Sequence, residues 1–244
     1  MNVMTRNQPK AILVDLDDTI IIFSACADEY WHRVCDRFAQ RIDGMTSQKL
    51  FDGINESRTW FWSDPERHRV GRLDLITARR EIVADAFRRM EMSALTLVNE
   101  IADAYSEERK EGIRLIPGAI EALRSMRQQG IKLALITNGD TAGQKEKIEA
   151  FGLADYFDCI LIEEEFGRGK PSEEVYLEAL SILGVAPEET WMVGDNLEWD
   201  VAAPQRLGIK GIWVDGNGSG MDKGSTVRPD RIIRSLSELQ GREQ

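Results

Sequence analysis

Two carboxylates stand two positions apart directly after an apolar run near the N-terminus. The run Ala11-Ile12-Leu13-Val14 leads into Asp15, and Asp17 follows. Such a run is typical of a strand that is buried on both faces, as in a parallel sheet. An unpaired carboxylate is costly to bury, so we expect the strand to end at Asp15. Because ligands of open α/β sheets bind outside the carboxyl edge, both acids are candidate site residues.

Taken alone, this pair is also compatible with a solvated acidic turn. Three later stretches favour a site instead: Ile136-Thr137-Asn138-Gly139, Gly169-Lys170-Pro171, and Val193-Gly194-Asp195-Asn196-Leu197-Glu198-Trp199-Asp200. Two of them, at Thr137 and Asp195, again follow apolar runs. Parallel strands bring their carboxyl ends to one edge, so we expect these side chains to converge in one cleft.

Each stretch also has a purely structural interpretation. Asn138-Gly139 is a strong turn signal, and Lys170 stands before a proline that can begin a helix. Asp195 and Asp200 would suit the cap of a following helix. The occurrence of all of them together with Asp15 and Asp17 favours the site.

In this order, the four stretches resemble the motifs of the haloacid dehalogenase-like (HAD) superfamily, and the resemblance covers about residues 10–215. It implies the phosphatase branch with a helical cap inserted after the first motif. The implied activity is magnesium-dependent hydrolysis of a phosphomonoester of a small soluble metabolite, either a nucleoside monophosphate or a sugar phosphate.

The resemblance also implies roles for the acids. Asp15 would be the nucleophile that forms an aspartyl phosphate, and Asp17 would be the general acid and then the base. The carboxylates of Asp15 and Asp195 and the backbone carbonyl of Asp17 would hold Mg²⁺, which suits so small a set of oxygen ligands. Asp200 would contact the water shell of the metal.

The phosphate-binding groups follow in the same way from the resemblance. Lys170 would contact the phosphoryl group and Asp15, while Thr137 would donate its hydroxyl and Asn138 its backbone N–H to phosphoryl oxygens. Such fixed donors stabilise charge that develops in a transition state. Asp18 stands where glycine is more usual in the family, which adds negative charge without replacing Asp15 or Asp17.

Asp17 distinguishes this reading from two alternatives on the same fold. The haloacid dehalogenases of the superfamily lack this second acid and displace halide from carbon. A sugar-phosphate mutase uses both acids and stays an alternative, although the glycine that usually follows the second acid is Asp18 here.

Residues 23–111 form a helical insert, because their apolar residues recur at three- and four-residue steps. We expect four helices packed as a bundle, the cap domain. Within it, Arg58, Trp60, Trp62 and Arg72 are candidate substrate-specificity residues, since a ring of the substrate can stack on tryptophan. The alternative is that these aromatics form the bundle core and the arginines a solvated turn.

The remainder, residues 1–22 and 112–244, alternates apolar runs with helical segments and glycine stops. Strands are expected at 11–15, 131–136, 158–162, 190–193 and 210–214, and a short helix at Leu236–Gln240. Alternation of this kind predicts a Rossmann-like α/β fold with a parallel sheet between two helical layers, the catalytic core.

Composition excludes several classes of protein. The 244 residues carry a net charge of −11, which disfavours nucleic-acid polymers as partners. Three scattered cysteines lack the spacing of a zinc site. No segment reads as a signal peptide or membrane span, so we expect a cytoplasmic protein without membrane contact. Its partner would be a small phosphorylated substrate, and the state a monomer or a homodimer.

Overall fold

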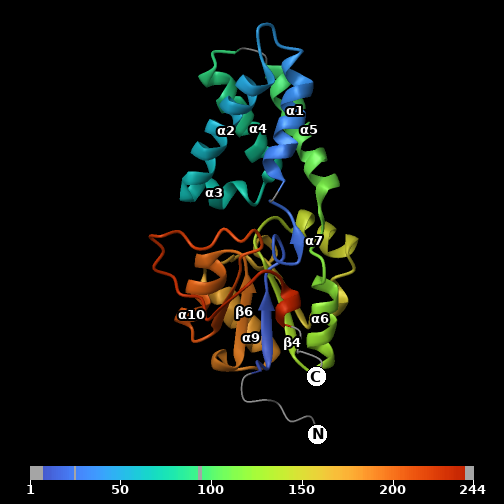
Figure 1. Cartoon of the computed structure of the whole chain (residues 1–244), viewed down its shortest axis with the longest axis vertical. Helices are drawn as coiled ribbons and strands as arrows, with labels where there is room; N and C mark the ends of the chain where they lie inside the picture. Colours follow the sequence, from blue (N-terminus) through green and yellow to red (C-terminus); the bar gives the residue numbers. More distant parts are fainter. Residues whose placement is uncertain (1–7, 25, 93–94, 240–244) are drawn as a thin grey trace. The chain divides into compact units, whose positions relative to one another are not determined.

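The computed structural model describes residues 8–24, 26–92 and 95–239 (Figure 1). The chain divides into two compact units, Met1–Ile22 with Arg114–Gln244, and Phe23–Ile113. We call the first the core unit and the second the helical unit. The boundaries expected from sequence were 22/23 and 111/112. That the units act as catalytic core and cap stays a prediction.

The core unit contains a six-stranded sheet in the order β5-β4-β1-β6-β7-β8, and every neighbouring pair is parallel. This confirms the Rossmann-like α/β fold expected from sequence. The strands are β1 (Ala11–Val14), β4 (Lys132–Thr137), β5 (Cys159–Ile162), β6 (Thr190–Gly194), β7 (Lys210–Val214) and β8 (Arg231–Ile233).

Two details of the sheet differ from the sequence-based expectation. β1 ends at Val14 rather than Asp15, although the Asp15 N–H still donates to the Val193 carbonyl at 2.9 Å. β8 was missed, because its three residues follow a glycine-rich loop and only Ile233 is buried. After it, Leu236–Leu239 forms a short helical turn, and Gln240 lies outside the described residues.

Helices flank both faces of the sheet. Ala11 and Leu13 of β1 belong to the apolar cluster that packs under helix α9, while Ile12 and Val14 on the opposite face are equally buried. β4 contacts both α6 and α9. The helical segments are α6 (Ala119–Gln128), α7 (Thr141–Ala150), η1 (Ala154–Tyr156), α8 (Glu163–Phe166), α9 (Glu173–Leu183), η2 (Pro187–Glu189), η3 (Leu197–Ala202), α10 (Ala203–Arg206) and η4 (Leu236–Leu239).

A second, two-stranded sheet lies at the ends of the insertion. β2 (Ile21–Ile22) pairs antiparallel with β3 (Arg114–Leu115), so the last core residues before the insertion meet the first ones after it. The partner strand of β2 therefore comes from beyond the helical unit in the sequence.

The helical unit contains five helices within its described residues, one more than expected. They are α1 (Ala27–Ala39), α2 (Ser47–Ser63), α3 (Pro65–Gly71), α4 (Leu75–Arg89) and α5 (Leu95–Gly112). The extra helix is α3, which lies between the second and third helices expected from the sequence. The Asp64 side chain caps it by accepting from the Arg67 N–H, and Pro65 at its first position needs no N–H partner.

The interior of the helical unit is apolar and aromatic. Trp31 stacks on Tyr105 with ring centres 3.8 Å apart, and Leu50, Ile54 and Phe87 are almost fully buried. Among the described helices of the whole chain, none combines the length and the apolar character that a membrane crossing requires.

Candidate active site

The centre of the candidate site is a buried lysine between two carboxylates. Lys170 Nζ donates to Asp15 Oδ1 at 2.6 Å and to Asp200 Oδ1 at 2.7 Å. Only 1% of the Lys170 surface is exposed, and Asp200 is buried to the same degree. The three residues come from the end of β1, the segment before α9, and η3. Asp15 and Lys170 thus lie together as expected, and Asp200, for which the resemblance implied a contact with the water shell of the metal, pairs with the same lysine.

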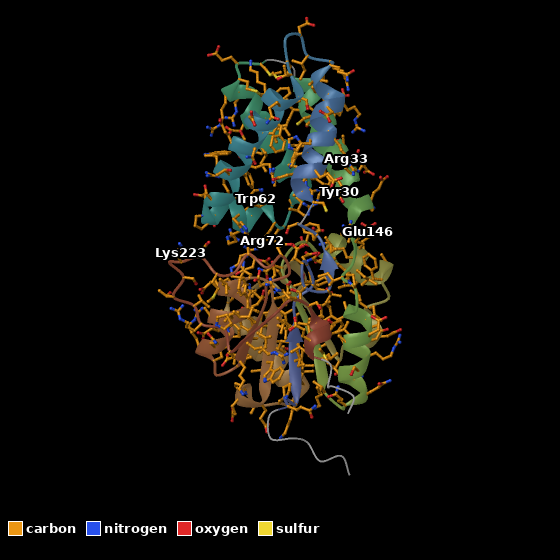
Figure 2. All side chains as sticks on the ribbon, viewed as in Figure 1. Tyr30, Arg33, Trp62, Arg72, Glu146 and Lys223 are labelled. Carbon is orange, nitrogen blue, oxygen red and sulfur yellow. The ribbon has the colours of Figure 1, made fainter. Side chains whose placement is uncertain are left out.

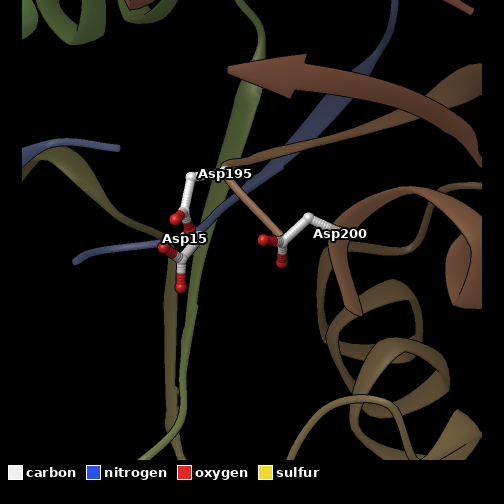
Figure 3. A group of neighbouring side chains, drawn as sticks. All are labelled: Asp15, Asp195 and Asp200. Carbon is white, nitrogen blue, oxygen red and sulfur yellow. The ribbon is translucent and has the colours of Figure 1, made fainter. Parts of the chain in front are cut away.

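Asp195, which follows β6, joins these residues. One carboxylate oxygen from each of Asp15, Asp195 and Asp200 lies within 4.8 Å of the others. Figure 3 shows the three carboxylates turned toward a common space. When all are ionised, three carboxylates surround one ammonium group, so two negative charges stay uncompensated.

Burial and this imbalance raise the pKa values of Asp15 and Asp195. Burial, reinforced by repulsion from Asp200 and only partly offset by Lys170, raises the pKa of Asp15 to about 7. Solvent still reaches Asp195, but the protein packed around it limits its hydration. This desolvation, with repulsion from Asp15 and Asp200, raises the pKa of Asp195 to about 8.

Lys170 responds in the opposite sense. Burial by itself would lower the pKa of its ammonium group, but attraction from Asp15 and Asp200 outweighs burial and raises that pKa above its ordinary value. The lysine therefore stays charged, whereas Asp15 and Asp195 resist ionisation. A divalent cation would supply the missing positive charge.

The donor set fits Mg²⁺, a hard cation that prefers oxygen ligands and few carboxylates. Asp15 and Asp195 offer carboxylate oxygens to the same space. Asp200 is otherwise engaged: Oδ1 accepts from Lys170, and Oδ2 accepts from the Asn196 N–H at 3.0 Å. Those bonds favour an indirect contact of Asp200 with a metal. The carbonyl of Asp17 as a ligand stays a prediction.

Local sequence explains how Asp200 reaches the cluster. Asn196 caps η3 by accepting from the N–H groups of Glu198 and Trp199 at 3.0 and 2.9 Å. Gly194 leaves room for the carboxylate, because a Cβ at that position would lie 2.2 Å from Asp200 Oδ2. The glycine of this motif is thus required by close approach of a side chain.

Thr137 and Asn138 lie at the end of β4, beside Lys170. The Asn138 side chain donates to the Lys170 carbonyl at 2.7 Å and accepts from the Lys170 N–H at 2.8 Å. Thr137 is buried, and its hydroxyl accepts from Gln144 at 2.5 Å. Asn138 therefore holds the lysine backbone through its side chain, an arrangement that sequence reasoning missed.

Asp17 faces a different set of groups from Asp15. Lys147 Nζ lies 2.8 Å from both carboxylate oxygens of Asp17, and Gln144 Nε2 donates to Asp17 Oδ2 at 3.2 Å. Both partners are buried on α7, three residues apart, so they share one helix face. Sequence reasoning missed them. The available signal was two long polar residues at helical spacing after the Asn138-Gly139 turn.

Asp18 adopts the left-handed conformation, with φ of 59°. Glycine adopts that conformation without strain, and aspartate tolerates it better than most residues. This explains both the usual glycine of the resembled motif and its replacement by Asp18.

The four candidate specificity residues all belong to the helical unit, where Figure 2 labels Trp62 and Arg72. Trp60 and Trp62 are half-buried and pack against the bundle cluster. Arg58 and Trp62 line a cavity inside this unit, whereas Trp60 and Arg72 are not among its lining residues. Arg67 lies over the Trp60 ring, 4.0 Å from its centre. Their role in specificity stays a prediction.

Comparison with known proteins identifies relatives of the chain. The family model of haloacid dehalogenase-like hydrolases matches residues 9–208. A phosphoserine phosphatase of Thermus thermophilus is 38% identical over 154 residues, which are 63% of this chain and 56% of that protein. A glyceraldehyde 3-phosphate phosphatase of Pyrococcus furiosus is 31% identical over 94% of this chain and 91% of its own length.

The fold has close solved counterparts. The HAD-hydrolase YfnB of Bacillus subtilis, solved bound to magnesium, superposes with a TM-score of 0.70 at 24% identity, covering 96% of this chain and 97% of that one. At this identity, the likeness bears on the fold alone. The family match and the two phosphatase relatives make the assignment. The chain belongs to the haloacid dehalogenase-like hydrolase family, within its phosphatase branch.

Proposed function

We propose that this protein is a magnesium-dependent phosphomonoester hydrolase that works through an aspartyl phosphate on Asp15. The observation that carries the proposal is the cluster of buried Asp15, Lys170 and Asp200 with solvent-accessible Asp195. It combines a nucleophilic carboxylate, a fixed ammonium group and an excess of negative charge that suits a divalent cation. Its substrate is a small phosphorylated metabolite.

Asp15 is the nucleophile in this mechanism. Its Oδ1 is held by Lys170, while its Oδ2 accepts no hydrogen bond from the described residues. Oδ2 attacks the phosphorus, the bond from phosphorus to the ester oxygen breaks, and the phosphoryl group becomes attached to Asp15. Lys170 holds the attacking carboxylate in place and offsets negative charge on the phosphoryl oxygens.

Asp17 moves the protons. In its protonated form it gives a proton to the departing alkoxide, and it then takes a proton from the water that attacks the aspartyl phosphate. Cleavage of that bond releases inorganic phosphate and restores Asp15. Lys147 and Gln144 hold the Asp17 carboxylate on the α7 side of the site between these steps.

Asp15 and Asp195 are the carboxylates that would hold Mg²⁺, with the Asp17 carbonyl as third protein ligand. When bound, the ion offsets repulsion between the carboxylates and a phosphate dianion, which is about 4 kcal/mol per charge pair at 4 Å in an effective dielectric of about 20. Thr137 and the Asn138 N–H bind phosphoryl oxygens, and Asp200 would contact the water shell of the metal.

The substrate class is a sugar phosphate or a nucleoside monophosphate. The Pyrococcus furiosus relative supports the first, because its name specifies glyceraldehyde 3-phosphate, and its alignment extends over nearly the whole chain. The Thermus thermophilus relative is named for phosphoserine, another small phosphomonoester.

A panel of these monoesters tests the proposal. Phosphate release is measured with Mg²⁺ and with EDTA, for the wild type and for Asp15→Asn. We expect turnover with Mg²⁺ only, and a loss of about 10³-fold or more in kcat in the variant. Asp18→Asn is the matched control, because asparagine also tolerates the left-handed backbone at that position, and its turnover should stay near wild type.

Unchanged turnover in Asp15→Asn would refute the mechanism. Halide release from 2-haloacids without added metal would favour the dehalogenase alternative, and conversion of one sugar phosphate into an isomer without phosphate release would favour the mutase. The presence of Asp17 favours phosphomonoester hydrolysis over the dehalogenase reaction.

A further inference from the structure

Gln144 is a buried glutamine on α7 whose side-chain amide meets three groups of the candidate site. Its Nε2 donates to Thr137 Oγ1 at 2.5 Å, to the Asn138 carbonyl at 2.7 Å and to Asp17 Oδ2 at 3.2 Å. Only 3% of the Gln144 surface is exposed. The three acceptors belong to two segments of the core unit, the one after β1 and the end of β4, so this single amide connects them.

The chemistry of the acceptors determines how the amide is turned. A backbone carbonyl and a carboxylate have no hydrogen to donate, so the –NH2 end of Gln144 faces Asn138 and Asp17. Thr137 must then accept from the same –NH2 group. A hydroxyl has one hydrogen and two lone pairs, so this bond leaves the hydroxyl hydrogen for another acceptor. Its contact with the Asn138 carbonyl is long, at 3.5 Å, and that hydrogen can therefore turn toward a phosphoryl oxygen at little cost.

The position of Asp17 also depends on this face of α7. The amide of Gln144 has two hydrogens for three acceptors, and Asp17 is the most distant of the three. Lys147 Nζ, 2.8 Å from both carboxylate oxygens of Asp17, supplies further donors. Gln144 and Lys147 stand three residues apart and share one helix face. A displacement of the Gln144 amide would therefore disturb Asp17 and Thr137 together.

Two glutamates of α8 hold the start of α7. Glu163, which is buried, accepts from the Gly139 N–H through Oε2 at 3.1 Å. Glu164 Oε2 accepts from the N–H of Thr141, the first residue of α7, at 2.7 Å. Gln144 lies about one turn further along the helix. Its place beside the end of β4 is therefore defined by the packing of α7 and α8, without a substrate.

We propose that Gln144 is a positioning residue of this site, which turns the Thr137 hydroxyl toward a phosphoryl oxygen and holds Asp17 where it moves protons. The inference rests on the proposed function and extends it to a residue outside the four stretches named from the sequence. Gln144 acts through its two partners rather than on the reacting atoms. Both effects depend on its N–H donors and not on the size of its side chain.

Two esters of similar size distinguish loss of proton transfer from general damage. Benzyl phosphate releases a strongly basic alkoxide that needs a proton, whereas para-nitrophenyl phosphate releases a weakly basic phenolate that leaves without one. Gln144→Met removes the N–H donors and keeps a side chain of similar length. The kcat/KM of each ester is measured with Mg²⁺, because it compares the transition state with free enzyme and free ester. Partial unfolding would lower both values alike.

We expect Gln144→Met to lower kcat/KM by about 10²-fold for benzyl phosphate and by about tenfold or less for para-nitrophenyl phosphate. The smaller loss reflects the Thr137 hydroxyl, which both esters need. For the same reason, the affinity for inorganic phosphate, measured by titration calorimetry in Mg²⁺, should fall by about threefold or more.

Gln205→Met is the matched control. Gln205 Nε2 also donates to a carbonyl and a carboxylate, those of Arg228 and Asp230, both at 2.8 Å. Asp230 accepts from the Gly211 N–H as well, near the start of β7 and not at its carboxyl end. The kcat/KM values of Gln205→Met and its affinity for phosphate should therefore stay near those of the wild type.

Equal losses for the two esters in Gln144→Met, or unchanged kinetics, would overturn the inference and leave the proposed function in place. Gln144→Asn, one methylene shorter, should shift the ratio of the two kcat/KM values in the same direction, and it decides if Gln144→Met does not fold by circular dichroism. If the wild type releases phosphate from neither ester, the affinity for inorganic phosphate decides, and an unchanged affinity in Gln144→Met overturns the inference. The panel of metabolites tests the proposed function separately.

Discussion

The two units of the chain bury charges of opposite sign. In the core unit, the carboxylates of buried Asp15 and Asp200 and of solvent-accessible Asp195 outnumber the ammonium group of Lys170. In the helical unit, the guanidinium of Arg109 is buried, and its Nε has no hydrogen-bond partner among the described residues. The two units therefore differ in the sign of the charge that is left without full compensation.

Asp85 shows what a purely structural buried charge looks like in the same protein. It lies in the helical unit and is buried, but Ser57, Arg88 and Arg89 donate to it at 2.9, 2.9 and 2.5 Å. Burial opposes ionisation of this carboxyl, yet the bonds to Arg89 and Ser57 lower its pKa on balance. The charge of Asp85 is therefore balanced within the protein, whereas the carboxylates around Lys170 are left with an excess of negative charge.

The largest change in stability and activity should come from removing the positive charge of Lys170 in the core unit. Lys170→Met removes the ammonium group that pairs with Asp15 and Asp200, so we expect about 3–5 kcal/mol less free energy of unfolding in metal-free protein and loss of turnover. Urea unfolding and phosphate release measure the two. Lys145→Met removes an exposed lysine that pairs with Glu165, and should change stability by less than about 1 kcal/mol. Similar losses of stability and turnover in Lys170→Met and Lys145→Met would contradict the special role of the buried lysine.

A smaller effect should come from displacing Asp200 without changing any charge. In Gly194→Ala the new Cβ would lie 2.2 Å from Asp200 Oδ2, so we expect about 1–3 kcal/mol less free energy of unfolding and lower kcat. Gly216→Ala is the control, because the nearest atom to its Cβ would be 3.8 Å away. Wild-type turnover in Gly194→Ala would mean that the position of Asp200 is unimportant.

The pH dependence of the free energy of unfolding should reveal the raised pKa of Asp195. The native pKa of Asp195 is about 8 against an ordinary value of 3.8, so the native state holds this proton more tightly than the unfolded chain. Metal-free protein therefore loses stability as pH rises through this window. Asp195→Asn cannot ionise, so near pH 9 in EDTA its Tm should exceed that of wild type by about 2–4 °C.

That advantage should shrink as pH falls toward about 5, where Asp195 is protonated in the native wild type. Thermal unfolding of both proteins across this range gives the measurement. Asp155→Asn, which alters an exposed carboxylate, should show no such pH-dependent difference. A Tm difference for Asp195→Asn that is independent of pH would refute the electrostatic interpretation.

The smallest effect should come from Arg109→Met in the helical unit. The substitution removes a hydrogen bond to Tyr105 but also relieves an uncompensated buried charge, so we expect a change below about 1 kcal/mol. Asp85→Asn, which breaks compensated bonds in the same unit, should destabilise by about 1.5–3 kcal/mol. Urea unfolding compares them. A larger loss for Arg109→Met would assign that arginine a structural role.

Much of the fold and the positions of the candidate site residues follow from the sequence alone. Uninterrupted apolar runs identify five of the six strands, because a strand buried on both faces has little other composition. Polar residues directly after those runs must share one edge when the strands are parallel. Asp15, Thr137 and Asp195 were therefore placed together without knowledge of any side-chain contact.

Only the tertiary structure reveals the partners of those residues. The bonds of Asn138 to the Lys170 backbone, and of Lys147 to Asp17, join positions 32 and 130 residues apart. Their formation depends on how helix α7 and the segment before α9 pack on the sheet. Periodicity identifies a helix face, but it does not determine which polar groups on that face meet a partner.

The same limit applies to the helical unit. Sequence named Arg58, Trp60, Trp62 and Arg72, yet the cavity is lined by the first and third of these together with Arg79 and Arg109. The spacing of apolar residues predicts that each helix buries one stripe of apolar side chains. The rotation of each helix about its axis is settled only when all stripes pack together, and that rotation decides which arginine is left facing a cavity.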